Sequence, residues 1–332
     1  MKLFKSIMLI WLPIAAMCLA MTACDVAEDE TDCIVEMKIR FRFTKNDGSD
    51  YFGSEVSSLS VFAFDAARKF VGRWDEYDNS KFGNDYSMLI PLPPGDYSFV
   101  VWGGLQDTNY YLCGGSQQHG QTLDPVVGQT TMSELMLRLS CNTRNSHTTQ
   151  MHYVDYIPTA LFHGVTNQMN LSDQTGEDIT IDLKKNSTQI NLTIIGLPPS
   201  TTRNPAQHMD IYMESPNGGY NFWNDLEANG RTFTYVQHNT AGNTEIQTSS
   251  LYTLKMQYGN GHRLTIYNTD TGSEFYTADL LEDYIRKVPA YNSQDAVDAE
   301  DVFDITIDAR SNLGVTITVN GWNVGVSGNV IQ

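Results

Sequence analysis

The first long stretch after the amino-terminal region alternates apolar and polar residues. Val35, Met37, Ile39, Phe41 and Phe43 are apolar, and a charged residue stands between each neighbouring pair. Side chains of a β-strand point alternately to its two faces, so this period of two predicts a strand with one buried face. Shorter apolar runs that end at turn residues predict strands at 59–64, 86–92, 97–102, 135–139, 160–164 and 178–183. Residues 105–127 are rich in glycine and lack a period, which predicts a loop.

A polar stretch at residues 184–187 (KKNS) interrupts this pattern, and we interpret it as a hinge. Beyond it, strands are predicted at 189–195, 208–214, 232–236, 250–257, 263–268, 304–308 and 315–319. A chain of roughly 300 residues is longer than one hydrophobic core usually serves. We therefore expect an N-terminal β-sandwich at 33–185 and a C-terminal β-sandwich at 186–332.

Helical spacing is confined to residues 280–287 (LLEDYIRK), where Leu281, Tyr284 and Ile285 fall on one side. Many short strands separated by Gly, Pro and Asn are typical of β-sandwiches. The pattern therefore predicts an all-β chain of two sandwiches with at most one short helix.

The amino terminus has a different pattern. Lys2 and Lys5 precede an apolar run at residues 7–20, which is shorter than the roughly 20 residues of a membrane-spanning helix. This order is typical of a secretory signal, so we expect a signal peptide at residues 1–23. One interpretation is a plain signal cleaved after an alanine, with Cys24 an ordinary residue.

The other interpretation starts from the position of Cys24 directly after Thr22 and Ala23, which resembles a bacterial lipobox, although Met21 stands where Leu is commonest. The resemblance implies that the Cys24 thiol is acylated and that lipid holds the protein at the cell outer membrane, because several acyl chains bind far more firmly than one. Residues 25–32 (DVAEDETD) have no apolar period, so 24–32 is expected to be a lipidated tether. Acidic residues behind the cysteine also resemble the surface-export signal of Bacteroidetes lipoproteins, and a solvated linker is the alternative.

Charge excludes one class of partner. The full chain has a net charge of −18, with 21 basic and 39 acidic residues. Without the signal peptide 19 basic and 39 acidic residues remain, which gives a net charge of −20. Such a chain repels nucleic acid, so no nucleic-acid role is expected.

The sequence contains no catalytic or cofactor-binding motif, and no enzyme activity, cofactor or metal site is predicted. The seven histidines stand singly, and there is neither a Gly-x-Ser-x-Gly elbow nor a phosphate-binding glycine loop. Residues 295–308 are acidic but lack the spacing of a calcium loop, so we expect a solvated loop leading into a strand. Residues 45–50 (KNDGSD) predict a hairpin turn. The thiols that can form one disulfide, or can all be buried without one, are Cys33, Cys113 and Cys141.

Several segments together resemble the FimB-type fimbrial anchor family of Bacteroidales, whose members are surface lipoproteins. The segments that carry this resemblance are Cys24, the first strand from Cys33, 92–104 (LPPGDYSFVVWGG), 160–164 (ALFHG), 183–196 (LKKNSTQINLTIIG) and 315–324 (VTITVNGWNV). The resemblance implies two tandem transthyretin-like sandwiches with Greek-key connections. It also implies a non-enzymatic protein that binds fimbrial pilin subunits, ends subunit addition and fixes the fimbrium to the outer membrane.

Two further interpretations remain open. A surface glycan-binding lipoprotein is the main alternative function, and a hydrolase with an inconspicuous site is a third. The aromatic residues that either stack on sugars or belong to the core are Tyr110, Tyr111, Tyr220 and Trp223. Residues 313–332 stay apolar to the end of the chain, so this tail is either the last sandwich strand or a strand shared with a neighbouring pilin.

Overall fold

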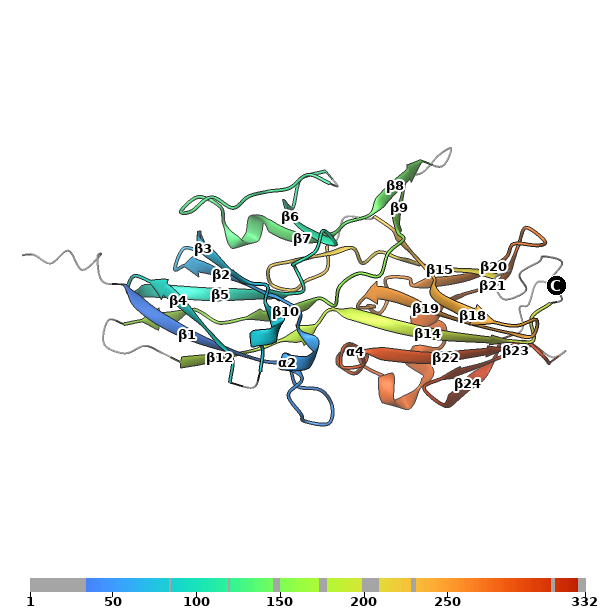
Figure 1. Ribbon diagram of the computed structural model, residues 1–332. Coiled ribbons are helices and arrows are strands. Elements are labelled where there is room, and N and C mark those ends of the chain that lie inside the picture. The colour runs from blue at the N-terminus through green and yellow to red at the C-terminus, as the bar shows by residue number, and fades with distance from the viewer. Residues whose placement is uncertain are drawn as a thin grey trace, which may run out of the picture.

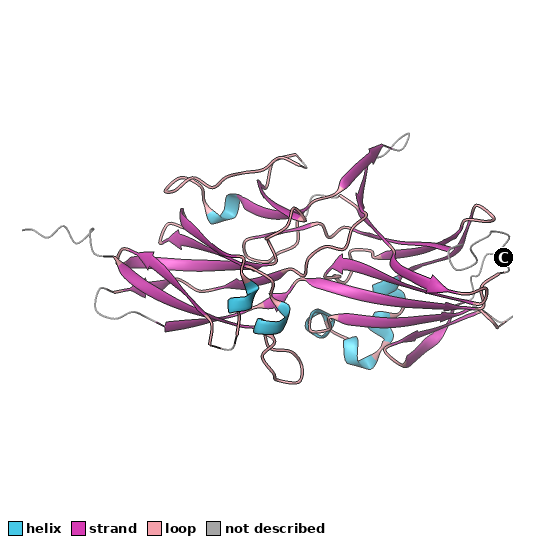
Figure 2. Ribbon diagram, in the orientation of Figure 1, coloured by secondary structure: helices cyan, strands magenta, loops and turns pink. Residues whose placement is uncertain are grey.

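The computed structural model describes residues 34–83, 85–118, 120–145, 150–172, 178–198, 209–227, 231–311 and 314–327. The molecule is elongated, with two β-rich halves arranged end to end (Figure 1). Strands make up most of the fold and the helices are short (Figure 2). The prediction of a mostly β chain is confirmed, whereas the signal peptide and Cys24 lie outside the described residues.

The first half contains two facing sheets. Its three-stranded sheet has the order β12 (Asp178–Asp182), β1 (Val35–Arg42) and β4 (Ser87–Leu92). The second sheet has the order β13 (Lys184–Lys185), β10 (Phe162–Val165), β5 (Gly95–Gly103), β2 (Leu59–Asp65) and β3 (Phe70–Glu76), with β11 (Met169–Leu171) also beside β5. The alternation in β1 buries Met37, Ile39 and Phe41 between the sheets, as the sequence predicts.

The central strands β2 and β5 are buried on both faces. Val61 and Val101 belong to the core between the two sheets, whereas Phe62 and Trp102 belong to a second core on the opposite face. A strand covered on both sides has no polar face, which explains why these two strands are continuous apolar runs in the sequence.

A third sheet covers that opposite face. Its order is β16 (Gly219–Asn221), β7 (Leu135–Leu139) and β6 (Tyr110–Gly114), and a 3-10 helix at Met132–Glu134 precedes β7. The prediction that residues 105–127 are only a loop is wrong, because β6 lies within them. The five residues of β6 pair along the whole length of β7. A strand of five residues that lies between glycines is too short to show an apolar–polar alternation in the sequence.

The second half is a sandwich of two larger sheets. One has the order β18 (His238–Gly242), β19 (Ile246–Leu254), β14 (Ser187–Ile195), β22 (Val302–Asp308), β23 (Val315–Val319) and β24 (Trp322–Ser327). The other, called the outer sheet below, has the order β21 (Ser273–Asp279), β20 (Arg263–Asn268), β15 (Met209–Ser215), β17 (Phe233–Val236), β9 (Gln150–Val154) and β8 (Asn142–Asn145). Their inner faces enclose one apolar core.

The expectation of at most one short helix is wrong. The described chain contains α2 (Phe52–Glu55), α3 (Leu280–Asp283) and α4 (Gln294–Asp298), besides 3-10 helices at Asn79–Lys81, Ile285–Lys287 and Pro289–Tyr291. The helix predicted at 280–287 is present as α3 and the turn after it. Helices of four or five residues are too short to show a helical period, and α4 is held by a local contact, because Ser293 accepts a hydrogen bond from the Ala296 amide.

The polar hinge predicted at 184–187 is also wrong. β13 and β14 occupy these positions, and Asn186 between them is 4% exposed. The Asn186 amide donates to the Leu161 carbonyl at 2.7 Å, and the Asn186 carbonyl accepts from the Lys255 amide at 3.0 Å. The chain therefore crosses from one half to the other as bonded, buried backbone.

The two halves also exchange strands. β9 from the first half pairs in parallel with β17, and β16 from the second half pairs with β7. The core around Phe62 and Trp102 accordingly contains Phe222 and Tyr235 from the second half. Both facing sheets of the first half use only strands that precede Asn186, whereas the third sheet and the outer sheet of the second half use strands from both sides of it.

Candidate functional site

The carboxyl-terminal tail, which the sequence offers either as the last sandwich strand or as a shared strand, forms a hairpin of β23 and β24 in the described chain. Val319 pairs with Trp322, and Asn320 and Gly321 form a two-residue loop with φ values of 45° and 82°. Positive φ at both loop positions is what a type I′ hairpin needs, and an Asn-Gly pair adopts it readily. The Asn320 amide donates to the Asp304 carbonyl at 2.8 Å, which fixes the turn against β22.

β24 is an edge strand. Within the described chain it has one neighbour, β23, whose Val315, Ile317 and Val319 are buried in the core. The other side of an edge strand presents backbone groups that can pair with a strand of another chain. Trp322 is 54% exposed, the largest exposed side chain of this hairpin.

This edge is partly protected against unspecific pairing. The register between β23 and β24 shifts between Ile317 and Thr318, and Gly325 has a φ of 126°. The Gly325 amide donates to the Asn323 side chain at 3.0 Å. Bulges and occupied amides are usual devices that limit edge-to-edge association. Residues 315–327 are thus the last strands of their own sandwich, while Leu313 and residues 328–332 lie outside the described residues.

The aromatic residues that the sequence suggested for sugar stacking do not form one platform. Tyr110 is 7% exposed and Tyr220 is 3% exposed. The Tyr110 hydroxyl donates to the Thr159 carbonyl at 2.7 Å, and Tyr220 packs in the core beside Trp102. Trp223 is exposed at the entrance of a cleft between the halves. The core interpretation is therefore correct for Tyr110 and Tyr220.

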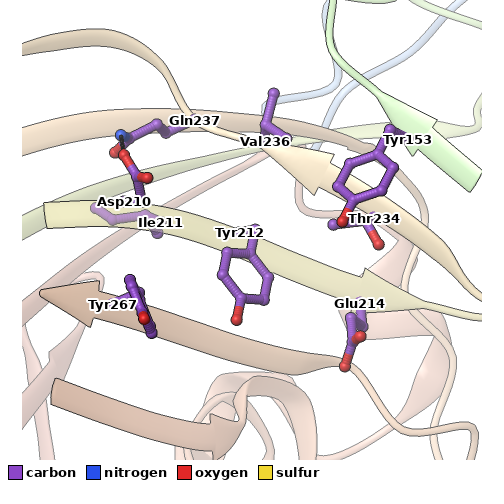
Figure 3. A pocket seen from close by; sticks show the side chains of 9 residues that line it. All are labelled: Tyr153, Asp210, Ile211, Tyr212, Glu214, Thr234, Val236, Gln237 and Tyr267. Atoms are coloured by element: carbon purple, nitrogen blue, oxygen red, sulfur yellow. Dashed lines mark hydrogen bonds between the residues drawn. The ribbon is translucent and has the colours of Figure 1, made fainter. Parts of the chain in front are cut away.

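A different set of tyrosines lies on an open sheet face. Tyr153, Tyr212 and Tyr267 line a groove of about 470 Å³ on the outer sheet of the second half (Figure 3). The sequence analysis did not select them. The available signal was the alternation within β15, where Met209, Ile211 and Met213 are buried and the residues between them face outward.

An ion-pair network holds the two halves together at the cleft. Lys185 lies 3.0 Å from Glu55 and 3.5 Å from Asp301, and Lys255 lies 3.3 Å from Asp301. Lys45 also pairs with Glu55. Burial would raise the pKa of Glu55, but the hydrogen bonds from Lys45 and Lys185 outweigh it and hold that pKa below its usual value. This cluster therefore acts as an internal contact between the halves.

The two acidic stretches are structural in the described chain. Residues 45–50 form the predicted turn, with the Gly48 amide donating to the Lys45 carbonyl at 2.9 Å. Within residues 295–308 a loop was expected to lead into a strand. The strand is present as β22, but the first residues of this stretch belong to α4 and not to a loop. The described residues contain no group of three His, Cys, Asp or Glu placed to hold a metal ion. Nor do they include a helix of the length and apolarity needed to cross a membrane.

One of the three thiols, that of Cys113, is buried and free. Cys113 in β6 is fully buried and in no disulfide, and burial raises its pKa to about 11. Cys141 lies 3.5 Å from His152 Nδ1. Cys33 lies outside the described residues, and the free thiol of Cys113 excludes this residue from the one disulfide that the sequence allowed.

Comparison with protein families adds a sequence relationship to this geometry. The model of a family described as fimbrillin-A associated anchor proteins Mfa1 and Mfa2 matches residues 29–326. No curated protein is significantly similar to the chain in sequence.

Several solved structures have a similar fold. The fimbrial anchor protein Mfa2 from Porphyromonas gingivalis is 19% identical, with a TM-score of 0.67 over 89% of this chain and 100% of that chain. A candidate polysaccharide-binding protein from Bacteroides thetaiotaomicron is 20% identical, with a TM-score of 0.71 over 90% of this chain and 98% of that chain. A candidate adhesin from Bacteroides ovatus is 19% identical, with a TM-score of 0.68 over 87% of this chain and 95% of that chain.

Proposed function

Because the chain belongs to the family of fimbrillin-A associated anchor proteins, we propose that it fixes a fimbrium to the bacterial outer membrane and ends the addition of pilin subunits. The family consists of structural proteins of the fimbrium, so the chain is a cell-surface structural protein and not an enzyme. The resemblance to a fimbrial anchor family noted in the sequence is thereby confirmed. The single observation that carries the proposal is the family match over residues 29–326.

The membrane attachment is proposed to be lipid on Cys24, after removal of a signal peptide at 1–23. The lipobox-like order of residues before Cys24 supports it. β1 begins at the end of the first half that is remote from the second half (Figure 1). A tether at 24–32 that leads into this end would leave the second half pointing away from the membrane.

The two halves are proposed to be tandem transthyretin-like sandwiches with a boundary between residues 185 and 186. The facing sheets of the first half, which use strands before Asn186 alone, support this boundary. The fimbrial partner is proposed to be a pilin subunit that pairs with the open side of β24. Backbone bonds along an edge give affinity, and alternate side chains such as Trp322 give register.

Replacing the lipidated thiol tests the anchor. Cys24→Ala should leave the fold unchanged and should release both the protein and its fimbriae into the medium, because no acyl chain can be attached. Radiolabelled palmitate and fractionation of cells measure the effect, and Cys33→Ser is the matched control that should keep the label. Equal labelling and membrane retention in Cys24→Ala would exclude the lipid anchor. Fimbriae that stay attached in a strain lacking the protein would exclude the anchoring role.

A further inference from the structure

Three tyrosines form a row across the outer sheet of the second half. Tyr267 on β20 pairs with Asp210 on β15, Tyr212 lies two residues further along β15, and Tyr153 on β9 lies level with Glu214. Figure 3 shows the three side chains on neighbouring strands, and all three line the same groove. The row is therefore diagonal and spans four neighbouring strands.

The dimensions of the row follow from sheet geometry. Neighbouring strands lie about 4.8 Å apart and residues rise about 3.3 Å along a strand. Three strand spacings and four residue rises separate Tyr267 from Tyr153, which gives a row of roughly 20 Å. A ligand that contacts all three rings is therefore extended and larger than a single sugar or amino acid.

The rings are not required by the fold. Residues on the inner face of this sheet, such as Ile211 and Leu264, are fully buried in the sandwich core. Tyr153, Tyr212 and Tyr267 lie on the outer face instead and are only partly buried there. Polar or charged residues usually occupy such a face, so a row of aromatic rings indicates a contact surface.

The charged side chains among the described residues that line the groove are the carboxylates of Asp210 and Glu214. Asp210 receives one long bond of 3.5 Å from Gln237, and Glu214 makes no hydrogen bond or ion pair with the described residues. None of the described side chains that line the groove is Lys or Arg. Arg263 lies opposite Glu214 but donates to Thr277 at 3.0 Å and pairs with Glu274. The lining residues that the structure describes therefore offer aromatic faces and carboxylates, and none of their side chains is cationic.

We propose that this face binds a neutral oligosaccharide, a role that is separate from anchoring the fimbrium. The apolar faces of sugar rings stack on the tyrosines, and sugar hydroxyl groups donate to the carboxylates of Asp210 and Glu214. An acidic polysaccharide is repelled by these carboxylates and by the net charge of −18. The length of the row fits a chain of several sugar units.

The test uses the purified full-length Cys24→Ala chain, in which only the proposed acylated thiol is changed. Affinity electrophoresis in gels that contain yeast mannan, galactomannan, xyloglucan or laminarin should show retardation by at least one of these neutral polysaccharides. Polygalacturonate should not retard the chain. Titration calorimetry with the retarding polysaccharide then gives the affinity.

Substitutions on the row locate the binding. Tyr212→Ala should weaken binding roughly tenfold or more, whereas Tyr212→Phe keeps the ring and should retain most of it. Glu214→Gln keeps the shape of the side chain but removes its charge, and it should also weaken binding. This variant tests the proposal even if Tyr212→Ala does not fold. Tyr77→Ala is the matched control, because Tyr77 is 51% exposed in the other half.

Three outcomes would overturn the proposal. The first is that none of the four neutral polysaccharides retards the chain. The second is that the wild type, Tyr212→Ala and Glu214→Gln are all retarded equally. The third is that the chain binds a lysine-rich peptide saturably and does not bind sugar. Fimbrial retention in cells carrying Tyr212→Ala should be normal. A loss of retention in this variant would show that this face contacts the fimbrium and would contradict the separation of sugar binding from anchoring.

Discussion

Arg138 and Glu227 form a buried ion pair that joins the two halves of the molecule. Arg138 Nε lies 2.9 Å from both carboxylate oxygens of Glu227, and the two side chains are 1% and 8% exposed. Arg138 belongs to β7 of the third sheet, whereas Glu227 follows β16 of the second half. Arg138 Nη1 also donates to the Gln117 carbonyl at 2.8 Å, so this one guanidinium holds three segments.

Breaking this pair should destabilise the protein strongly. Arg138→Met leaves the Glu227 carboxylate buried without its partner, which costs about 3–5 kcal/mol in comparable buried pairs. Denaturant unfolding of the purified chain measures the change. The double variant Arg138→Met with Glu227→Leu should recover a large part of the loss, because no unpaired charge remains. A double variant as unstable as the single one would show that packing of Arg138 dominates.

His163 should make stability depend on pH. Burial lowers its pKa to about 4, and the hydrogen bond with the Phe222 carbonyl offsets this only in part. The unfolded chain takes up a proton near the ordinary value of about 6.5. The stability is therefore complete above about pH 6.5 and falls as the pH drops toward 4, by about 3 kcal/mol.

The comparison with His163→Gln isolates this contribution, because other groups also titrate in the range. The glutamine amide can donate to the Phe222 carbonyl but does not titrate. The difference in unfolding free energy between the wild type and His163→Gln, measured from pH 7.5 to 4.5, should shrink as the pH falls. A constant difference would contradict the assignment.

Removing β24 should separate folding from fimbrial attachment. Deletion of residues 322–332 takes away β24, whose one neighbour in the described chain is β23, so the rest of the sandwich should still fold. Fimbriae should no longer be retained on cells, because the proposed pairing edge is lost. Circular dichroism and counts of cell-bound fimbriae provide the two measurements. Unfolding of the second half would instead make β24 a purely structural strand, and an intact fold with anchored fimbriae would exclude it from assembly.

A single substitution sharpens this comparison. Trp322→Ala changes an exposed side chain, so stability should stay within about 0.5 kcal/mol. If Trp322 contacts the pilin, fimbrial retention should fall. Leu89→Ala is the matched control, since Leu89 is 51% exposed on β4 of the first half. Equal retention in the two variants would remove Trp322 from the interface.

The proposed boundary between residues 185 and 186 makes a prediction about fragments. A fragment of residues 186–332 should fold its main sandwich but unfold at lower denaturant than the full chain. The reason is that Phe222 and Tyr235 lose their packing partners from the first half, and β17 loses β9. Adding a fragment of residues 33–185 should restore part of the stability. A fragment of residues 186–332 without any cooperative transition would place the boundary elsewhere.

Local patterns in the sequence were sufficient for features that depend on neighbouring residues. The alternation around Ile39 predicts β1, and the apolar runs around Val61 and Val100 predict β2 and β5, because a strand needs a side-chain period and little else. The turn at residues 45–50 follows from turn chemistry in the same way, whereas the hairpin at Asn320-Gly321 was not predicted and was found only in the structure. The lipobox-like segment at Cys24 is likewise a linear motif, and its role stays a prediction.

Only the tertiary structure decided which elements meet. β6 and β16 are too short to show a period, and each exists because it pairs with β7, which lies far from β16 in the sequence. The alternation within β15 marks the outward side of Tyr212, whereas the burial of Tyr220 depends on β7 and on the core that contains Trp102, both of which lie far from it in the sequence. Which side a strand buries depends on the sheets packed against it, and those contacts join residues whose separation in the chain leaves no local trace.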